Sequence, residues 1–250
     1  SYEEVMLMAK VHMILQGNGG VGKSLIASIL AQHCYAKKKD ILCIDTDPVN
    51  ATFYGFKKLN VTRLDLMDGD NVDPRKFDHL VEMITKSKSD VIIDNGASTF
   101  VGLSHYLISN QVSTMLREMG HELVIHTVIT GGQSLTDTVN GFNRIIQQFP
   151  TDVTFIVWLN QFWGKIEMNG KKFEAMKAYI DNKSRISAIV TIPEYKMETF
   201  GRDLREMLQD KLTFDEAIAK PEILIMVRQR LKIIKDDLFK QLEGAQAVLA

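Results

Sequence analysis

The sequence predicts a single α/β domain in which helices flank both faces of a mostly parallel sheet. Short apolar runs alternate along the chain with longer segments whose apolar residues recur at helical spacing. The apolar runs are hydrophobic on both faces, as strands buried inside a parallel sheet must be. The 250 residues, 45% of them hydrophobic, are enough for one sizeable core, and no shift of composition divides them.

The expected elements follow one another along the chain. A helix begins at Lys23, directly after the first strand and a glycine-rich turn. The segment 73–89 is expected to be a helix with Asp73 as N-cap and Pro74 at its first position. Further helices are expected at 134–149 and from Phe214 onward. The expected strands are VHMILQ (11–16), ILCIDTD (41–47), DVIIDNG (90–96), HELVIHTVIT (121–130), TFIVWLN (154–160) and SAIVTIP (187–193).

Composition and charge restrict the class of protein. The net charge is -1, which indicates neither a standing nucleic-acid surface nor a standing membrane surface. No apolar run is long enough to span a bilayer. The two cysteines, Cys34 and Cys43, fall in a helical and a strand pattern, so we expect reduced, buried thiols in a cytoplasmic protein. Residues 1–7 have no signal-peptide pattern and are expected to be an expression remnant, which leaves 8–250 as the domain.

The stretch GNGGVGKS, from Gly17 to Ser24, matches the phosphate-binding pattern G-x-x-x-x-G-K-[ST]. It follows an expected strand and opens an expected helix, which is the context that phosphate binding requires. Glycines let backbone N–H groups approach phosphate oxygens, and the helix directs its positive end toward them. Lys23 would neutralise β and γ oxygens, and the Ser24 hydroxyl would ligate Mg²⁺. The expected nucleotide-lining residues of this loop are Gly17, Gly19, Gly20, Val21, Gly22, Lys23, Ser24 and Leu25.

Carboxylates follow two of the expected strands. Asp94 comes directly after an apolar run, in the position of a Walker B acid, and would hold the Mg²⁺ shell, in part through water. Asp45 and Asp47 end another strand, and strand alternation puts both on the same face. Because the carboxyl ends of parallel strands line the ligand crevice, all three acids are expected beside the phosphate loop. Asp45 and Asp47 could instead be solvated turn formers before Pro48.

The glycine-rich loop, the stretch IDTDP and the strand VIID together resemble the ParA/MinD group of P-loop ATPases, over nearly the whole of 8–250. The resemblance implies a P-loop ATPase fold, ATP or ADP with Mg²⁺ as ligands, and dimerisation around the nucleotide. It implies that Asp47 helps to position the attacking water, that Asp45 lies near the metal and that Asp94 is the Walker B acid. It also implies that Asn160 and Pro193, each following a late strand, lie beside the adenine.

Other stretches carry a narrower resemblance, to conjugal-transfer proteins of broad-host-range plasmids within this group. They are MAKVHMILQG, CIDTDPVNATF, VIIDNGAS, LSHYLISNQV, HTVITGGQ and RQRLKI. This resemblance implies a role in plasmid conjugation, with conjugation or relaxosome proteins as partners. ATP is favoured over GTP because Gln161, Phe162 and Trp163 follow Asn160, so the acid of the guanine-reading N-K-x-D turn is missing. Trp163 could cover the base or simply cap the sheet.

Asn18 departs from the ParA/MinD pattern, which has a lysine at this loop position. In the group that lysine is thought to reach phosphates bound by the other subunit. Asn18 has one methylene and no charge, so it would exchange a charge-assisted bond for a weaker one or none. The asparagine could be engineered, a natural loss in a switch that hydrolyses poorly, or offset by another cation. We expect binding through Lys23 to survive while hydrolysis and dimerisation weaken.

Three other classes of protein remain as alternatives. A small-molecule ATP-dependent enzyme of the dethiobiotin synthetase type would use the Thr130-Gly131-Gly132 turn to line a substrate pocket. A redox or metal-carrier protein is disfavoured because no C-x-x-C pair is present. A DNA-partition ATPase would need a basic face, and the C-terminal helical segment offers candidates beside an apolar stripe that is expected to be core. These cations are Arg228, Arg230, Lys232 and Lys235.

Overall fold

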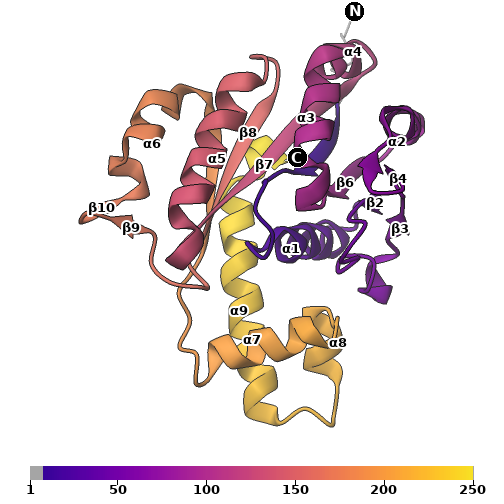
Figure 1. Cartoon of the computed structure of the whole chain (residues 1–250). Coiled ribbons are helices and arrows are strands. Elements are labelled where there is room, and N and C mark those ends of the chain that lie inside the picture. The colour runs from indigo at the N-terminus through magenta and orange to yellow at the C-terminus, as the bar shows by residue number, and fades with distance from the viewer. Residues whose placement is uncertain (1–7, 250) are drawn as a thin grey trace, which may run out of the picture.

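A seven-stranded parallel sheet, in the order β11-β8-β7-β1-β6-β2-β3, forms the centre of the molecule in the computed structural model, which describes residues 8–249 (Figure 1). The expectation for residues 1–7 lies outside the described residues. The predicted fold class is confirmed, including the parallel pairing of β1 with both β6 and β7. The strands are β1 (Ala9–Ile14), β2 (Ile41–Asp45), β3 (Thr62–Arg63), β6 (Asp90–Asp94), β7 (His121–Thr130), β8 (Thr154–Asn160) and β11 (Ile186–Ile192), with two antiparallel hairpins, β4 (Met67–Asp68) with β5 (Asn71–Val72) and β9 (Glu167–Met168) with β10 (Lys171–Lys172).

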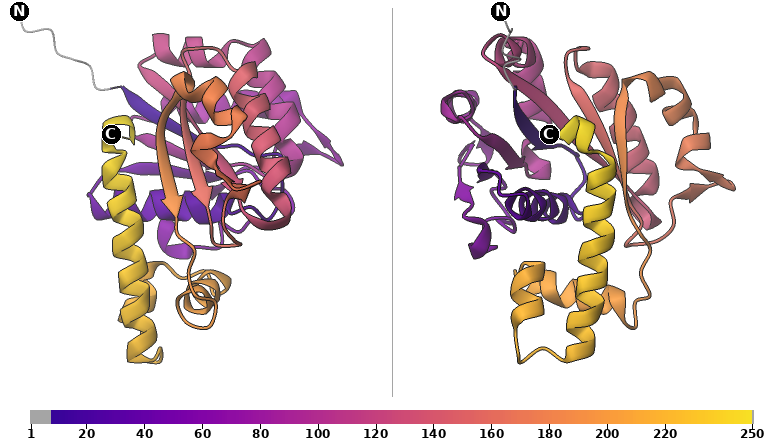
Figure 2. Two further views of the ribbon diagram at one scale, coloured as in Figure 1. Left: turned by 90° about the vertical axis from the view of Figure 1, so that its left-hand side faces the viewer. Right: turned by 180° about the vertical axis from the view of Figure 1, so that it is seen from behind.

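Helices cover both faces of this sheet, and each face has its own apolar core (Figure 2). One face packs against α1 (Lys23–Ala36), α7 (Phe200–Gln209), α8 (Phe214–Ala219), α9 (Ile225–Gly244) and α10 (Gln246–Leu249). The other face packs against α2 (Pro74–Lys86), α3 (Phe100–Ser109), α4 (Val112–Glu118), α5 (Leu135–Gln148) and α6 (Lys177–Asn182). The predicted cap of α2 is confirmed, since the Asp73 side chain accepts a hydrogen bond from the backbone N–H of Arg75.

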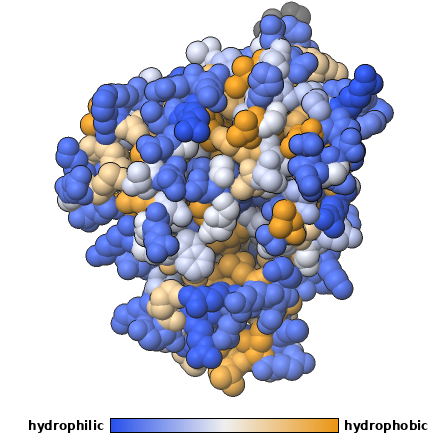
Figure 3. Space-filling model, viewed as in Figure 1, coloured by the Kyte–Doolittle hydropathy of each residue, from blue (hydrophilic) through white to orange (hydrophobic). Residues whose placement is uncertain are grey.

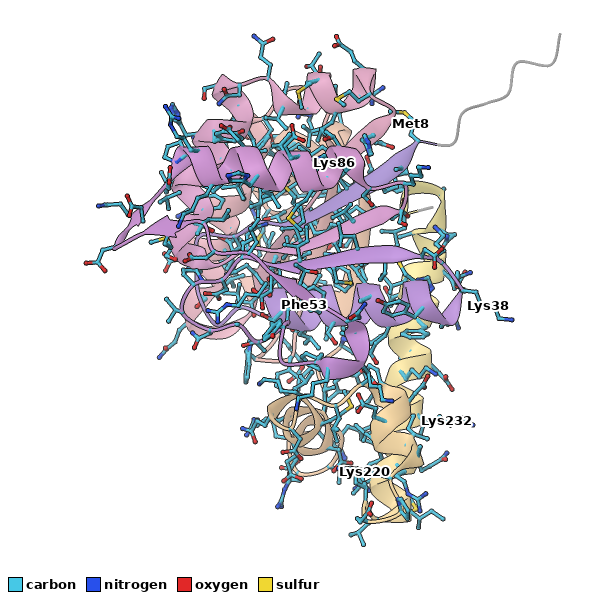
Figure 4. The ribbon with its side chains drawn as sticks, turned by 90° about the vertical axis from the view of Figure 1, so that its right-hand side faces the viewer. Met8, Lys38, Phe53, Lys86, Lys220 and Lys232 are labelled. Carbon is cyan, nitrogen blue, oxygen red and sulfur yellow. The ribbon has the colours of Figure 1, made fainter. Side chains whose placement is uncertain are left out.

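The C-terminal segment forms a helical part below the sheet, where the labelled Lys220 and Lys232 lie (Figure 4). The sequence predicts helix from Phe214 onward, but the helix stops after Ala219 and resumes at Ile225. Pro221 lies in this interruption and cannot continue the hydrogen-bond ladder of a helix. The expected apolar stripe is core: Leu231, Ile234 and Leu238 are buried on the sheet side of α9.

A buried polar network crosses the middle of the sheet. The indole N–H of Trp158 donates to His126 Nδ1, and His126 Nε2 lies 2.9 Å from His12 Nδ1. Burial lowers the pKa of His12 to about 4 and holds that of His126 well below its usual value, so both rings are neutral near pH 7. The pair is therefore a neutral, buried polar link between β1, β7 and β8.

The surface in Figure 3 is mostly hydrophilic, with apolar residues scattered over the upper and middle parts of this face and a further group at its lower end. Leu224, Ile225 and Met226 are the exposed apolar side chains where α9 begins. Within residues 8–249 no helix combines the length and the apolar character needed to cross a membrane.

Candidate nucleotide site

The phosphate loop joins the carboxyl end of β1 to the start of α1, as predicted. Gly20 and Gly22 have φ angles of +69° and +104°, in the left-handed region that favours glycine. A Cβ on Gly22 would lie 2.6 Å from the amide nitrogen of Asn160, so a side chain there would also collide with β8. The loop conformation therefore depends on glycine both for its backbone angles and for the close approach of Asn160.

A cavity of about 500 Å³ opens over this loop. It is large enough for part of a nucleotide, since small-molecule sites measure roughly 300–1,000 Å³. Predicted site residues from the loop and from the end of β2 meet in its wall. The lining residues are Gly19, Gly20, Gly22, Lys23, Ser24, Leu25, Asp47, Val49, Asn50, Thr52, Ala97, Ser98 and Trp163.

Lys23 is buried at the base of the loop, and its ammonium donates to the backbone carbonyl of Asn18 at 2.5 Å. Burial lowers the pKa of Lys23, while the carboxylates of Asp94 and Asp47 act in the opposite direction. A cation held in this way can exchange the carbonyl for phosphate oxygens with little rearrangement. The arrangement fits the role that the motif gives to this lysine.

Ser24 and Asp94 are joined by a hydrogen bond of 2.6 Å from the hydroxyl to the carboxylate. Burial raises the pKa of Asp94 to about 7, although the Ser24 bond and Lys23 favour its charged form. Hydroxyl and carboxylate oxygens are ligands that suit Mg²⁺, and a buried carboxylate beside a phosphate site gains from a divalent cation. Residues 8–249 contain no group of three His, Cys, Asp or Glu that could hold a metal alone. Phosphate oxygens and water would have to complete the shell, as is usual for Mg²⁺.

Asp45 and Asp47 lie on the same side of the site as Asp94, and the register of β2 with β6 pairs Asp45 with Asp94. Asp45 is fully buried, and its two carboxylate oxygens accept the backbone N–H groups of Asp47 and Tyr54, each at 2.9 Å. Asp45 therefore shapes the turn that follows β2. Its expected place near the metal stays a prediction.

Asp47 reaches the cavity itself. One of its oxygens accepts the N–H groups of Val49 and Asn50, at 2.9 and 3.1 Å. No hydrogen bond to its second oxygen is found within residues 8–249, so that oxygen could orient a water molecule. A Cβ on Gly96 would lie 2.9 Å from Asp47 Cγ, so the segment after β6 packs tightly against this carboxylate.

Asn160 is the last residue of β8, and both the nitrogen and the oxygen of its side-chain amide form hydrogen bonds. Its nitrogen donates to the carbonyl of Val21 in the phosphate loop at 3.0 Å, and its oxygen accepts the N–H of Phe162 at 3.1 Å. Pro193 follows β11 and does not line the loop cavity. A separate cavity of about 440 Å³ is lined by chain neighbours of both residues, namely Gln161, Thr191 and Glu194. The adenine contacts of Asn160 and Pro193 stay predictions.

Some residues of the site were not identified from the sequence. Gln16 supports the start of the loop: its side chain accepts the N–H of Gly17 and donates to the carbonyl of Val128. The available signal was a polar residue at the end of the apolar run VHMILQ, just beyond β1. Val49 and Ser98 line the cavity from the turns after β2 and β6, where no local pattern marks them. Trp163, which the sequence left open between covering the base and capping the sheet, forms part of the cavity wall.

Comparison with known proteins agrees with this geometry. A family model described as the CobQ/CobB/MinD/ParA nucleotide binding domain matches residues 12–233. A curated protein of Escherichia coli, Protein TraL, is 63% identical over 238 residues, which are 95% of this chain and 99% of the relative. A second E. coli Protein TraL is 62% identical with the same coverage. The narrower resemblance predicted from the sequence is thereby confirmed.

Solved structures show the same fold at low sequence identity. The MinC:MinD cell division complex of Aquifex aeolicus matches with a TM-score of 0.55 and 16% identity, covering 94% of this chain and 96% of that chain. MinD complexed with Mg-ADP from Pyrococcus horikoshii OT3 matches with a TM-score of 0.51 and 18% identity, covering 97% and 99%. The family match, the two relatives and the phosphate loop together show that the chain belongs to the CobQ/CobB/MinD/ParA family of nucleotide-binding domains.

Proposed function

We propose that this protein binds Mg²⁺-ATP as a P-loop ATPase or nucleotide switch and acts in plasmid conjugative transfer in the cytoplasm. The observation that carries the nucleotide site is the convergence of Lys23 and Ser24 at one cavity, with Asp94 bonded to Ser24 directly behind it. These groups supply a cation for phosphate, a hydroxyl for Mg²⁺ and a buried carboxylate for the metal shell. The conjugative role rests on the likeness to Protein TraL.

Adenine recognition is proposed at the ends of β8 and β11. This proposal is supported by the contact of Asn160 with the phosphate loop, since its amide donates to the carbonyl of Val21. The cavity beside Gln161, Thr191 and Glu194 offers room there. Asn160 would have to share or exchange its present hydrogen bonds to pair with a base edge.

Dimerisation around the nucleotide is supported by apolar side chains on the rim of the site. Val49 and Trp163 line the cavity yet are 74% and 50% exposed. Val101, 74% exposed, lies in the first turn of α3, shortly after the lining residue Ser98. Apolar side chains gathered at a site indicate a surface that another molecule covers. A second copy of this chain is the partner proposed here.

Asn18 is the point at which we propose that the ATP cycle is weakened. Its backbone carbonyl accepts Lys23, and within residues 8–249 its side chain makes no hydrogen bond. An uncharged side chain with one methylene cannot replace a long cation across a dimer. Charge-assisted bonds to phosphate contribute on the order of 1.5–3 kcal/mol, or about one to two decades in a rate or equilibrium constant.

The test of this proposal compares the present chain with its Asn18→Lys variant. ATP turnover and solution mass are measured with Mg²⁺, with and without ATP. We expect the variant to hydrolyse ATP about 10- to 100-fold faster and to dimerise at lower concentration. Asn110→Lys adds the same charge at an exposed position after α3 and should change neither quantity. Equal turnover and equal mass in Asn18→Lys and the present chain would contradict the weakening, and absence of nucleotide binding would contradict the function.

A small-molecule ATP-dependent enzyme is the second candidate function. A cavity of about 270 Å³, lined by the Thr130–Ser134 turn, adjoins the phosphate loop at Gly20. This is the turn that the sequence identified as a possible substrate wall. Manyfold stimulation of ATP turnover by a carboxylate or amine metabolite would favour this candidate. The DNA-partition alternative has less support, because Arg230 pairs with Asp203 and Lys235 with Asp215.

A further inference from the structure

Trp163 occupies an unusual place for a tryptophan. It lies after β8, is half exposed, and lines both the cavity over the phosphate loop and the smaller cavity beside the Thr130–Ser134 turn. Gly20 is the other residue that lines both cavities. Trp163 and the tip of the phosphate loop therefore both border the two cavities.

The loop that carries Trp163 is held firmly at its base. Asn160 accepts the N–H of Phe162, and Gly164 donates to the carbonyl of Gln161. On its other side the loop packs against the turn after β7, where a Cβ on Gly131 would lie 2.1 Å from the carbonyl oxygen of Gly164. The backbone is thus fixed by contacts with β8 and β7. The exposed indole therefore projects from a loop whose backbone is held by hydrogen bonds and close packing.

The end of the nucleotide that faces Trp163 follows from Lys23. The lysine of a phosphate loop reaches the β and γ phosphates, and here its ammonium lies against the carbonyl of Asn18. The segment Asn18–Gly20 therefore borders the terminal-phosphate end of the site, and Trp163 shares the cavity wall with Gly20. Within residues 8–249 the indole N–H has no hydrogen-bond partner, so a donor is free beside the place where a γ phosphate would lie.

We propose that Trp163 closes the terminal-phosphate end of the site, so that residues 161–165 sense whether a triphosphate or a diphosphate is bound. This inference rests on the proposed function, because it requires a nucleotide at the phosphate loop. A γ phosphate would bring its oxygens to the indole edge and displace water from it. A diphosphate would leave that end open. The contacts of Gly164 with Gly131 would pass the difference to the turn that precedes α5.

Tryptophan fluorescence provides a direct test, because one of the two tryptophans is buried and the other is exposed. Trp158 is 0% exposed and Trp163 is 50% exposed. Acrylamide quenching is measured on the full chain with Mg-ADP and with Mg-AMPPNP, at a concentration where light scattering shows a monomer. Calorimetry follows nucleotide binding independently. We expect AMPPNP to reduce quenching at least about twofold and ADP to change it little, while Trp163→Phe shows no response to either.

Affinities of three variants complete the test. Trp163→Ala should bind AMPPNP about tenfold more weakly and ADP less than about threefold more weakly, while Trp163→Phe should lie between. Ile180→Ala removes another exposed apolar side chain, on α6 and outside both cavities, and should change neither affinity.

Three results would overturn the proposal. In the first, Trp163 is quenched equally with and without AMPPNP, although calorimetry shows that AMPPNP binds. That result would leave the proposed function intact. Trp163→Ala could weaken ADP and AMPPNP equally, which would place the indole away from the terminal phosphate. Failure of both nucleotides to bind the unmodified chain would overturn the proposed function and this inference together.

Discussion

The two halves of the carboxyl edge of the sheet differ in chemistry. The half built from β1, β6 and β2 holds the charged groups Lys23, Asp94, Asp45 and Asp47. The half built from β7, β8 and β11 sets neutral groups against the phosphate-loop site, chiefly Asn160 and Trp163, while its charged residues Lys165 and Glu194 line the separate cavity of about 440 Å³. The difference separates two tasks. One half handles phosphate and metal charge, and the other fixes the shape of the loop that presents them.

Burial affects the polar side chains of the two halves differently. In the charged half it raises the pKa of Asp94 and Asp45 and lowers that of Lys23, so each group gains from an ionic ligand. In the neutral half both groups of the Asn160 amide are already satisfied within the protein. Substitutions in the charged half should therefore act on ligand binding, and those in the neutral half on binding and stability together.

The largest effect is expected from Lys23→Met, which removes the phosphate cation but keeps much of the side-chain length. Nucleotide affinity should fall at least about 100-fold, roughly 3 kcal/mol, because more than one charge-assisted bond is lost. Calorimetry with Mg-ATP measures the loss. Lys220→Met, in the lower helical part, is the matched control and should bind normally (Figure 4). Retention of affinity within threefold would show that charge in this half is not what holds the nucleotide.

A smaller effect on binding is expected from Asn160→Ala in the neutral half. The change leaves the carbonyl of Val21 and the N–H of Phe162 without partners, so the free energy of unfolding should fall by about 1–3 kcal/mol. Nucleotide affinity should fall about tenfold because the phosphate loop loses its support. Urea unfolding and calorimetry measure the two quantities.

Asn160→Asp separates the two hydrogen bonds of this residue. It keeps an acceptor for Phe162 but sets an oxygen against the carbonyl of Val21. If Asn160→Ala lowered affinity without lowering stability, the assignment of a supporting role to this half would be wrong.

The smallest effect concerns the proton on Asp94. Burial raises its pKa to about 7, so near pH 7 about half of the molecules hold the proton. Mg²⁺ favours the carboxylate, so binding of Mg-ATP should release about half a proton at pH 7. Affinity should rise as the pH increases through 7 and level off above about 8. Calorimetry in two buffers of different ionisation enthalpy counts the protons, and Asp94→Asn should release none. Equal heats in both buffers would contradict the assignment of Asp94 to the metal shell.

Much of the fold was predictable because a buried parallel strand is apolar over nearly its whole length. The bounds of β7 and β8 agree with the apolar runs, and the expected strands at 41–47 and 90–96 end two residues early, at Asp45 and Asp94. They end there because the turns that follow are fixed by side chains, such as the Asp45 carboxylate that accepts the N–H of Asp47. The hairpins β4–β5 and β9–β10 were not predicted, since two-residue strands are too short to show a period.

The sequence by itself determined the phosphate loop, because the motif, its strand and its helix are contiguous and their chemistry is local. It also placed Asp45, Asp47 and Asp94 at one edge, because strand ends in a parallel sheet share that edge. Only the tertiary structure decided that the Asp45 carboxylate accepts two backbone N–H groups, that Asn160 donates to Val21, and that Trp163 lines the same cavity as Gly20. These contacts join segments far apart in the chain, and their geometry is set by sheet order and by close packing at glycines.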